Sequence, residues 1–231
     1  MPFPIEVAAP TGFPDRSVRT RIKICGVSRD TDVEAAVNAG ADAIGLVFYP
    51  KSPRFVTLER ATNLARALPP FVTPVALFVN ATVAEVDAVC AAIPHVLLQF
   101  HGDETPAFCA ASGRPYLRAI RVSSGVDLLD SARQHPHAQA ILFDAEVEGF
   151  GGGGKVFDWS LIPSDVPRPV VLSGGLHAGN VIEGILRVRP WAVDVSSGVE
   201  AAKGIKDAAA IRRFCEAVRE ADARDASTSE A

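Results

Sequence analysis

Three side chains that could transfer protons or bind anions stand at or just beyond the ends of short apolar runs. Cys25 lies near the end of RIKICGV, Asp144 ends the apolar part of AILFDA, and Arg54 lies in the proline-containing segment YPKSPRFV. A thiol and a carboxyl group can act as base and acid, and a guanidinium can bind a carboxylate or a phosphate. The residue types therefore offer acid–base chemistry on an anionic substrate, provided that the fold brings them together.

The elements that would position these side chains follow one rhythm, in which β-rich runs alternate with alanine-rich runs of helical spacing. Eight β-rich runs are expected to form strands, at residues 21–27, 43–49, 74–79, 96–100, 116–122, 140–145, 169–175 and 192–198. Alternation of strand and helix predicts a parallel sheet covered by helices, and eight units close a (β/α)8 barrel. We therefore predict an α/β protein with a single TIM barrel, and a doubly wound open sheet is the alternative.

In such a barrel the last inward-facing residues of the strands meet at the carboxyl-terminal mouth, where barrel enzymes carry out their chemistry. Side chains alternate between the two faces of a strand, so Lys23 and Cys25 share one face of the first strand. Gln99 and His101 share a face at the end of the fourth strand, and Asp194 lies in the eighth. These polar residues are candidates for the mouth.

Glycine-rich turns follow the last three expected strands. Glycine lets backbone N–H groups approach an anion, and in barrels the loops after strands seven and eight often hold a phosphate. The turn after the sixth strand is no dinucleotide fingerprint, because no G-x-G-x-x-G opens a helix with an acidic residue about twenty positions later. We predict phosphate binding by Gly153, Gly154, Lys155, Gly174, Gly175, Ser196, Ser197 and Gly198.

Composition excludes several classes of function. The chain has 231 residues, of which 48% are hydrophobic, and a net charge of −4 without a basic tract, which gives no support for nucleic-acid binding. The four cysteines have neither C-x-x-C nor metal-ligand spacing, which favours a reduced, cytoplasmic setting without a metal. The N-terminus resembles neither a signal peptide nor a membrane span. We expect neither a nucleic-acid nor a membrane partner.

The chain is expected to hold one folded domain, because no linker is long enough to divide it. Residues 1–20, with their prolines and small residues, are predicted to be a flexible extension, and residues 21–220 to be the barrel. The last helix is expected from about residue 207 to 220, followed by a disordered tail over 221–231.

Seven segments, in order, resemble the phosphoribosylanthranilate isomerase family of tryptophan biosynthesis. They are KICG (23–26), GADAIGLVFYPKSPR (40–54), LQFHG (98–102), LFDA (142–145), GGGGKVFDW (151–159), LSGGL (172–176) and AVDVSSGVE (192–200). The resemblance covers about residues 21–220 and implies a TIM barrel. It also implies an Amadori rearrangement of N-(5-phosphoribosyl)anthranilate to 1-(2-carboxyphenylamino)-1-deoxyribulose 5-phosphate, without cofactor or metal. One departure is Gly153, where the family often has Ser or Thr.

The same resemblance implies roles for individual residues. Cys25 matches the general base of the family, Asp144 matches the general acid, and Arg54 matches the arginine that engages the anthranilate carboxylate. A thiol with an ordinary pKa near 8.5 is only about 3% ionised at pH 7, so we expect Lys23 to supply positive charge to Cys25. The acid must instead be protonated before it reacts. This requires either a raised pKa of Asp144 or a proton supplied with the bound substrate.

Each candidate also has a structural interpretation. An isolated cysteine such as Cys25 is more often a small buried hydrophobe, and a carboxyl group can cap a helix or form an ion pair. We assign substrate binding to Gln99, His101 and Asp194. Alternatively, the histidine orients a neighbour, and the aspartate pairs across the barrel with a lysine or arginine.

Three functions therefore compete. The first is the isomerase, which would work as a monomer or a homodimer on a sugar-phosphate substrate. The second is another phosphate-binding barrel enzyme, such as indole-glycerol-phosphate synthase or a histidine-pathway isomerase, which would need catalytic lysines or paired aspartates at strand ends. The third is a non-catalytic binder of a phosphate ligand. Cys25 at the end of the first strand disfavours the second, and the presence of both Cys25 and Asp144 disfavours the third.

Overall fold

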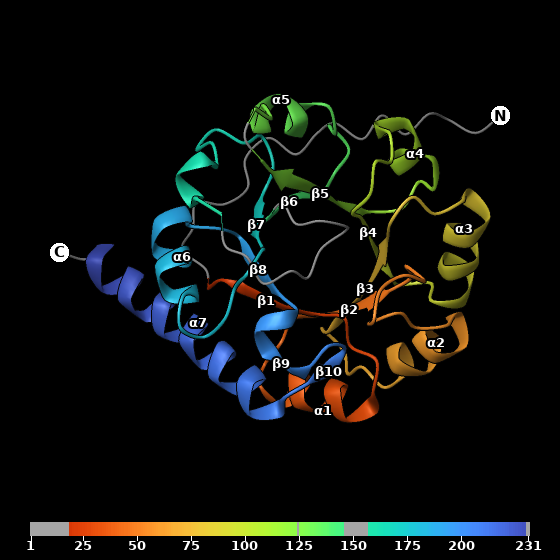
Figure 1. The fold of residues 1–231 in the computed structure, drawn as a ribbon, viewed down its shortest axis with the longest axis horizontal. Helices are drawn as coiled ribbons and strands as arrows, with labels where there is room; N and C mark the ends of the chain where they lie inside the picture. Colours follow the sequence, from red (N-terminus) through yellow and green to blue (C-terminus); the bar gives the residue numbers. More distant parts are fainter. Residues whose placement is uncertain (1–18, 124, 146–156, 230–231) are drawn as a thin grey trace.

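Eight parallel strands close into a barrel in the computed structural model, which describes residues 19–123, 125–145 and 157–229 (Figure 1). The strands pair in chain order, and β8 pairs with β1. This closure confirms the predicted TIM barrel and is incompatible with an open sheet. The strands are β1 (Arg21–Cys25), β2 (Ala43–Val47), β3 (Thr73–Phe78), β4 (Leu97–Phe100), β5 (Tyr116–Val122), β6 (Ala140–Ala145), β7 (Val170–Leu172) and β8 (Ala192–Val195).

The helices surround this barrel, as Figure 1 shows. Several begin with a side-chain cap, and α3 begins with a full capping box in which Thr82 and Glu85 bind each other's backbone N–H. The helices are α1 (Asp30–Asn38), α2 (Leu58–Arg66), α3 (Val83–Ala92), α4 (Pro106–Ala111), α5 (Leu128–Arg133), α6 (Val181–Val188) and α7 (Ala208–Ser229), with short 3-10 turns η1 (Trp159–Leu161) and η2 (Ser197–Val199).

Alternation along the strands divides the apolar residues into two sets. One set points outward and packs against the helices, forming the large core cluster. The other fills the centre of the barrel with a cluster that includes Val75, Leu117 and Leu142. Because every second residue faces inward, Asp144 follows Leu142 on the inner face, one step closer to the carboxyl end of β6. The apolar centre therefore forms the floor of the mouth.

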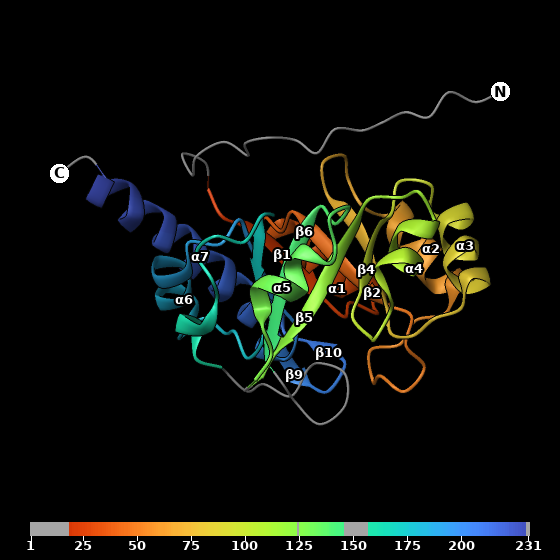
Figure 2. The same ribbon diagram turned by 90° about the horizontal axis from the view of Figure 1, so that it is seen from above.

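A small antiparallel hairpin follows β8, formed by β9 (Glu200–Ala202) and β10 (Ile205–Lys206), which the sequence analysis did not predict. Figure 2 shows it at the same end of the barrel as the orange loop between β2 and α2. Gly204 in its turn has φ +79°, and a Cβ there would lie 2.5 Å from the carbonyl oxygen of Pro53. Glycine thus lets the hairpin pack directly on the loop after β2.

Helix α7 extends further along the chain than the sequence analysis expected. It continues to Ser229, so residues 221–229 are helical rather than a disordered tail. Asp222 accepts hydrogen bonds from the Thr20 backbone N–H at 2.9 Å and from the Thr20 hydroxyl at 2.7 Å. Ala221 is fully buried. Although α7 is long, no helix within the described ranges is both long and apolar enough to cross a membrane.

Asp222→Ala should lower the free energy of unfolding by about 1–3 kcal/mol, because it leaves two donors of Thr20 without their charged acceptor. Denaturant unfolding measures this change. Glu220→Ala is the matched control, since it removes only a solvent-exposed pair with Arg224 on the same helix and should cost less than about 0.5 kcal/mol. Equal effects of the two substitutions would contradict a role for Asp222 in fastening the start of β1.

Candidate active site

Cys25 and Asp144 both lie at the carboxyl ends of their strands, as the sequence predicts. Cys25 is the last residue of β1 and is 5% exposed, and Asp144, next to last in β6, is 6% exposed. The adjacent strand leaves room for the thiol at Gly45, where a Cβ would lie 2.7 Å from the Cys25 sulfur. A larger residue at this position would therefore displace the thiol.

His101 connects Asp144 to Gln99 in a buried chain of polar groups. Its Nε2 lies 2.9 Å from Oδ2 of Asp144, and its Nδ1 lies 3.0 Å from Nε2 of Gln99. With the amide nitrogen donating to Nδ1, the histidine carries its proton on Nε2 and donates to an ionised Asp144. With the amide reversed, Nδ1–H donates to the amide oxygen and Nε2 can accept a proton from the carboxylic acid. The chain can thus accommodate Asp144 in either protonation state.

Lys23 and Asp194 form a buried ion pair inside the barrel. Their side chains are each 5% exposed, and Nζ of the lysine lies 2.9 Å from Oδ1 of the aspartate. The register between β1 and β8 places the two residues opposite each other. Burial alone would lower the pKa of Lys23, but the attraction of Asp194 and Cys25 outweighs it and raises that pKa. Asp194 therefore has the structural partner that the sequence analysis offered as its alternative role.

The pKa of the Cys25 thiol is raised, although Lys23 lies close enough to supply the positive charge that the sequence analysis expected. Burial raises its pKa and Asp194 raises it further, while Lys23 and Lys206 lower it, and the net pKa lies above the ordinary value. Lys23 does supply positive charge, but most of that charge is neutralised by Asp194. The thiol is therefore largely protonated at neutral pH in the absence of substrate.

Arg54 lies at the mouth in a tight ion pair that the sequence analysis did not predict. Its Nε and Nη2 donate to the two carboxylate oxygens of Glu200 at 2.7 and 2.8 Å. Lys206 donates to the same carboxylate at 2.9 Å. The stem of Arg54 crosses Gly26, where φ is +74° and a Cβ would lie 2.3 Å from the arginine Cδ. The glycine of KICG therefore makes room for the arginine.

The predicted phosphate turns after β7 and β8 lie side by side. A Cβ on Gly198 would lie 1.9 Å from the carbonyl oxygen of Leu176, so the two turns touch through their backbones. Gly174 has φ +83°, and a Cβ there would lie 2.4 Å from the backbone nitrogen of Ala145 and 3.0 Å from Oδ1 of Asp144. Gly174 is thus next to the candidate acid. The described part of the predicted phosphate set also includes Gly175, Ser196, Ser197 and Gly198. Gly153, Gly154 and Lys155 lie outside the described residues.

Comparison with known proteins points to one family. Residues 22–217 match the family model of N-(5'-phosphoribosyl)anthranilate (PRA) isomerase. Proteins with that name from Leptothrix cholodnii and Methylibium petroleiphilum are 72% and 70% identical over 211 residues, covering 91% of this chain and 96% and 99% of theirs. This chain belongs to the PRA isomerase family.

Solved structures of PRA isomerases agree with that assignment. The enzyme of Thermotoga maritima is 40% identical, with a TM-score of 0.81 over 87% of this chain and 99% of its own. A PRA isomerase solved with reduced 1-(o-carboxyphenylamino)-1-deoxyribulose 5-phosphate is 38% identical, with a TM-score of 0.76 over the same shares. Family membership confirms the isomerase prediction over indole-glycerol-phosphate synthase and the histidine-pathway enzymes.

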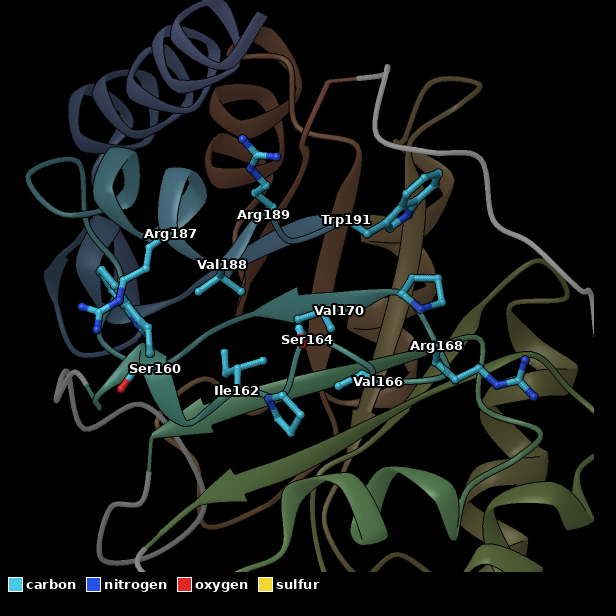
Figure 3. A pocket seen from close by; sticks show the side chains of 13 residues that line it. Ser160, Ile162, Ser164, Val166, Arg168, Val170, Arg187, Val188, Arg189 and Trp191 are labelled. Carbon is cyan, nitrogen blue, oxygen red and sulfur yellow. The ribbon is translucent and has the colours of Figure 1, made fainter. Parts of the chain in front are cut away.

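A separate pocket of about 500 Å³ lies beside β7 and is lined by residues of the segment 159–170, by the end of α6 and by Arg189 and Trp191 (Figure 3). Three arginines line it, but each has a partner: Arg187 pairs with Asp158, Arg189 pairs with Asp225, and Arg168 donates to the carbonyl oxygen of Pro136. These partners leave none of the three arginines of the pocket unpaired. Across the described ranges, no group of three or more His, Cys, Asp or Glu side chains is arranged to hold a metal ion.

Two functional candidates, Glu200 and Lys206, were missed from the sequence. Glu200 ends the segment AVDVSSGVE, so its position in the motif was a usable signal, although its charge partner lies 146 residues away in the chain. Lys206 carries no comparable signal, because lysine is usually a solvent-exposed residue. Only the β9–β10 hairpin, which sequence patterns did not predict, brings it into the mouth.

Removing one partner of the Lys23–Asp194 pair should lower the free energy of unfolding more than removing both partners. Lys23→Met and Asp194→Asn should each cost about 3–5 kcal/mol of unfolding free energy, because each leaves a buried charge unpaired. The double variant should cost much less than the sum, as measured by urea unfolding. The same cycle on the exposed Arg60–Asp30 pair should give a coupling below about 1 kcal/mol. Additive costs at Lys23 and Asp194 would contradict the buried pair.

Proposed function

We propose that Cys25 is the general base and Asp144 the general acid with which this isomerase converts N-(5-phosphoribosyl)anthranilate to 1-(2-carboxyphenylamino)-1-deoxyribulose 5-phosphate in tryptophan biosynthesis. The observation that carries this assignment is the pairing of a buried thiol with a buried carboxyl group at the carboxyl ends of β1 and β6. Each has a neighbour suited to its task, Lys23 for the thiol and His101 for the carboxyl group.

The reaction needs one proton delivered and one removed. Asp144 donates its proton to the furanose ring oxygen, the bond from that oxygen to C1′ breaks, and a protonated Schiff base forms. The Cys25 thiolate then takes the proton from C2′, and the electrons of the C–H bond neutralise the iminium nitrogen to give an enolamine. The enolamine tautomerises to the ketose product. His101 supports the first step, because its ring can bind Asp144 both before and after the proton leaves.

The substrate carries two anionic groups, a carboxylate on the anthranilate ring and a phosphate on the ribose. We propose that the carboxylate binds Arg54, at Nη1, since Glu200 occupies Nε and Nη2. The phosphate is assigned to the turns after β7 and β8, around Gly174, Gly175 and Ser196–Gly198, together with Gly153–Lys155. Two separate anion sites would hold the ribose between them and over the acid–base pair.

The hydrogen-bond partners of two other candidates change the roles that we propose for them. Gln99 and Asp194, first assigned to substrate binding, are proposed to act on their neighbours: Gln99 sets the orientation and tautomer of His101, and Asp194 holds Lys23. His101 itself contacts Asp144 and keeps its proposed role in substrate binding. No metal or organic cofactor enters this scheme, since proton transfer between side chains and substrate accounts for every step.

The proposal places the enzyme in the cytoplasm. Cys25, Cys90, Cys109 and Cys215 are all free thiols, a state that a reducing compartment maintains. Cell fractionation with an antibody to the chain tests this location. We propose assembly as a monomer or a homodimer, since the Thermotoga maritima enzyme is described as dimeric, and sedimentation equilibrium distinguishes the two states.

Loss of either proposed catalytic group should abolish most turnover. Cys25→Ala and Asp144→Ala should each reduce kcat by about 10²–10⁴-fold, the usual contribution of a general acid or base. The substrate is made in situ and its disappearance is followed by loss of fluorescence. Cys90→Ala is the matched control, because this buried cysteine lies in α3 and should leave kcat unchanged. A folded wild-type protein without turnover would favour the non-catalytic binder, and full activity in Cys25→Ala would remove the thiol as base.

The pH profile should report the raised pKa of the Cys25 thiol. Burial lifts that pKa above its ordinary value, so the thiolate becomes about tenfold more abundant for each unit of pH below the raised pKa. Alkylation of Cys25 by iodoacetamide, followed by peptide mass spectrometry, should therefore rise with pH through neutrality. Because turnover needs the Cys25 thiolate and a protonated Asp144 together, kcat/KM should not simply follow the thiolate fraction. A plateau of the alkylation rate reached below pH 7 would contradict the raised pKa.

A further inference from the structure

Lys206 is an unusually placed lysine. Its side chain is 0% exposed, although it belongs to a two-residue strand of the hairpin that follows β8. A buried ammonium group is costly unless strong partners replace its water. Its partners are the backbone oxygen of Ser196 at 3.0 Å, the hydroxyl of Ser196 at 3.3 Å and the carboxylate of Glu200 at 2.9 Å. All three bonds point to the segment that follows β8.

The hairpin that carries Lys206 is held in place from several sides. Arg29 donates to the backbone oxygen of Lys206 at 2.9 Å, and Asp32 in turn binds the Arg29 guanidinium. Gly204 packs against Pro53 in the loop after β2. The ammonium group is therefore fixed between three strand ends, those of β1, β2 and β8.

Glu200 is shared by two cations. It accepts both hydrogen bonds of Arg54 and a third from Lys206, so the cluster contains two positive charges and one negative charge. Burial lowers the pKa of Lys206, while the attraction of Glu200 and Cys25 opposes that shift, and Cys25 also attracts Arg54. With Lys206 protonated, the excess charge of the cluster is positive. A cluster with spare positive charge at this place suits an anionic substrate and a thiolate base.

From these contacts we infer that Lys206 and Glu200 are positioning residues of the isomerase reaction: they hold the Arg54 guanidinium and the turn at Ser196 in one fixed arrangement and keep a net positive charge beside Cys25. The inference rests on the proposed roles of Arg54, the turn after β8 and Cys25. It adds a function for the β9–β10 hairpin, which links the carboxylate site to the phosphate site.

The test uses the charge of the cluster. Lys206→Met makes the cluster neutral, Glu200→Gln makes it doubly positive, and the double variant returns it to one positive charge. The charged groups that act on Cys25 from the surrounding elements are Lys23 on β1, Asp194 on β8, Arg54 and Lys206. Only the cluster is altered, so a shift in the titration of Cys25 between variants follows the charge that was changed.

We expect KM for N-(5-phosphoribosyl)anthranilate to rise about tenfold or more in both single variants, because Arg54 loses part of its support. The base-side limb of the kcat/KM profile should move to higher pH in Lys206→Met and to lower pH in Glu200→Gln, by about half to one pH unit. The double variant should have its limb close to the wild-type position while its KM stays raised. Lys203→Met, an exposed lysine of the same hairpin, should change neither quantity.

Circular dichroism and the unfolding midpoint establish that each variant is folded. If Lys206→Met does not fold, the Glu200→Gln shift to lower pH decides the question. Folded variants with wild-type KM and an unmoved pH limb would overturn the inference, as would limbs that move in the same direction in both single variants. Failure of the proposed function itself is separate, because it would appear as absent turnover in the wild-type enzyme.

Discussion

The seam between β1 and β8 is the constraint on which the rest of the site depends. Closing the barrel there places Lys23 opposite Asp194 in the parallel register, and the pair is buried as a consequence. Neither charge could remain at this depth alone, so the register of the seam must keep the two partners together. Cys25 follows two residues after Lys23 on the same face of β1, and its surroundings are therefore fixed by barrel closure rather than by a mobile loop.

The charged residues of the mouth form three sets that differ in net charge. The charges of Lys23 and Asp194 cancel, and His101 and Asp144 can share one proton. The cluster of Arg54, Glu200 and Lys206 keeps an excess of positive charge. In the proposed function, a substrate with two anionic groups is attracted by the third set, and the first two sets keep their own partners. This division explains how a buried mouth can bind strongly charged molecules and still keep an acid and a base in workable protonation states.

Much of this arrangement was predictable from local patterns, and the rest depends on contacts far apart in the chain. Strand positions follow from β-rich runs, so Cys25 and Asp144 could be placed at strand ends, and the boundaries of β5 and β6 agree with those predicted. The hairpin of β9 and β10 is too short to produce a pattern, and the Glu200–Arg54 pair spans two loops. Helix α7 was predicted to end early because its last residues are small and polar, although Asp222 has a partner at the start of β1.

The raised pKa of Cys25 and the two-state chain of Gln99, His101 and Asp144 fit a cycle in which protons must be returned. In the proposed reaction, one turnover leaves the thiol protonated and the carboxyl group without its proton, so the pair ends in the reverse of its working state. A thiol that is mostly protonated at rest would need the positive charge of the mouth to become a base, and it would be a stronger base once ionised. His101 can pass from donor to acceptor without breaking its contact with Asp144. The site thus tunes acid and base through their neighbours rather than through direct contact between them.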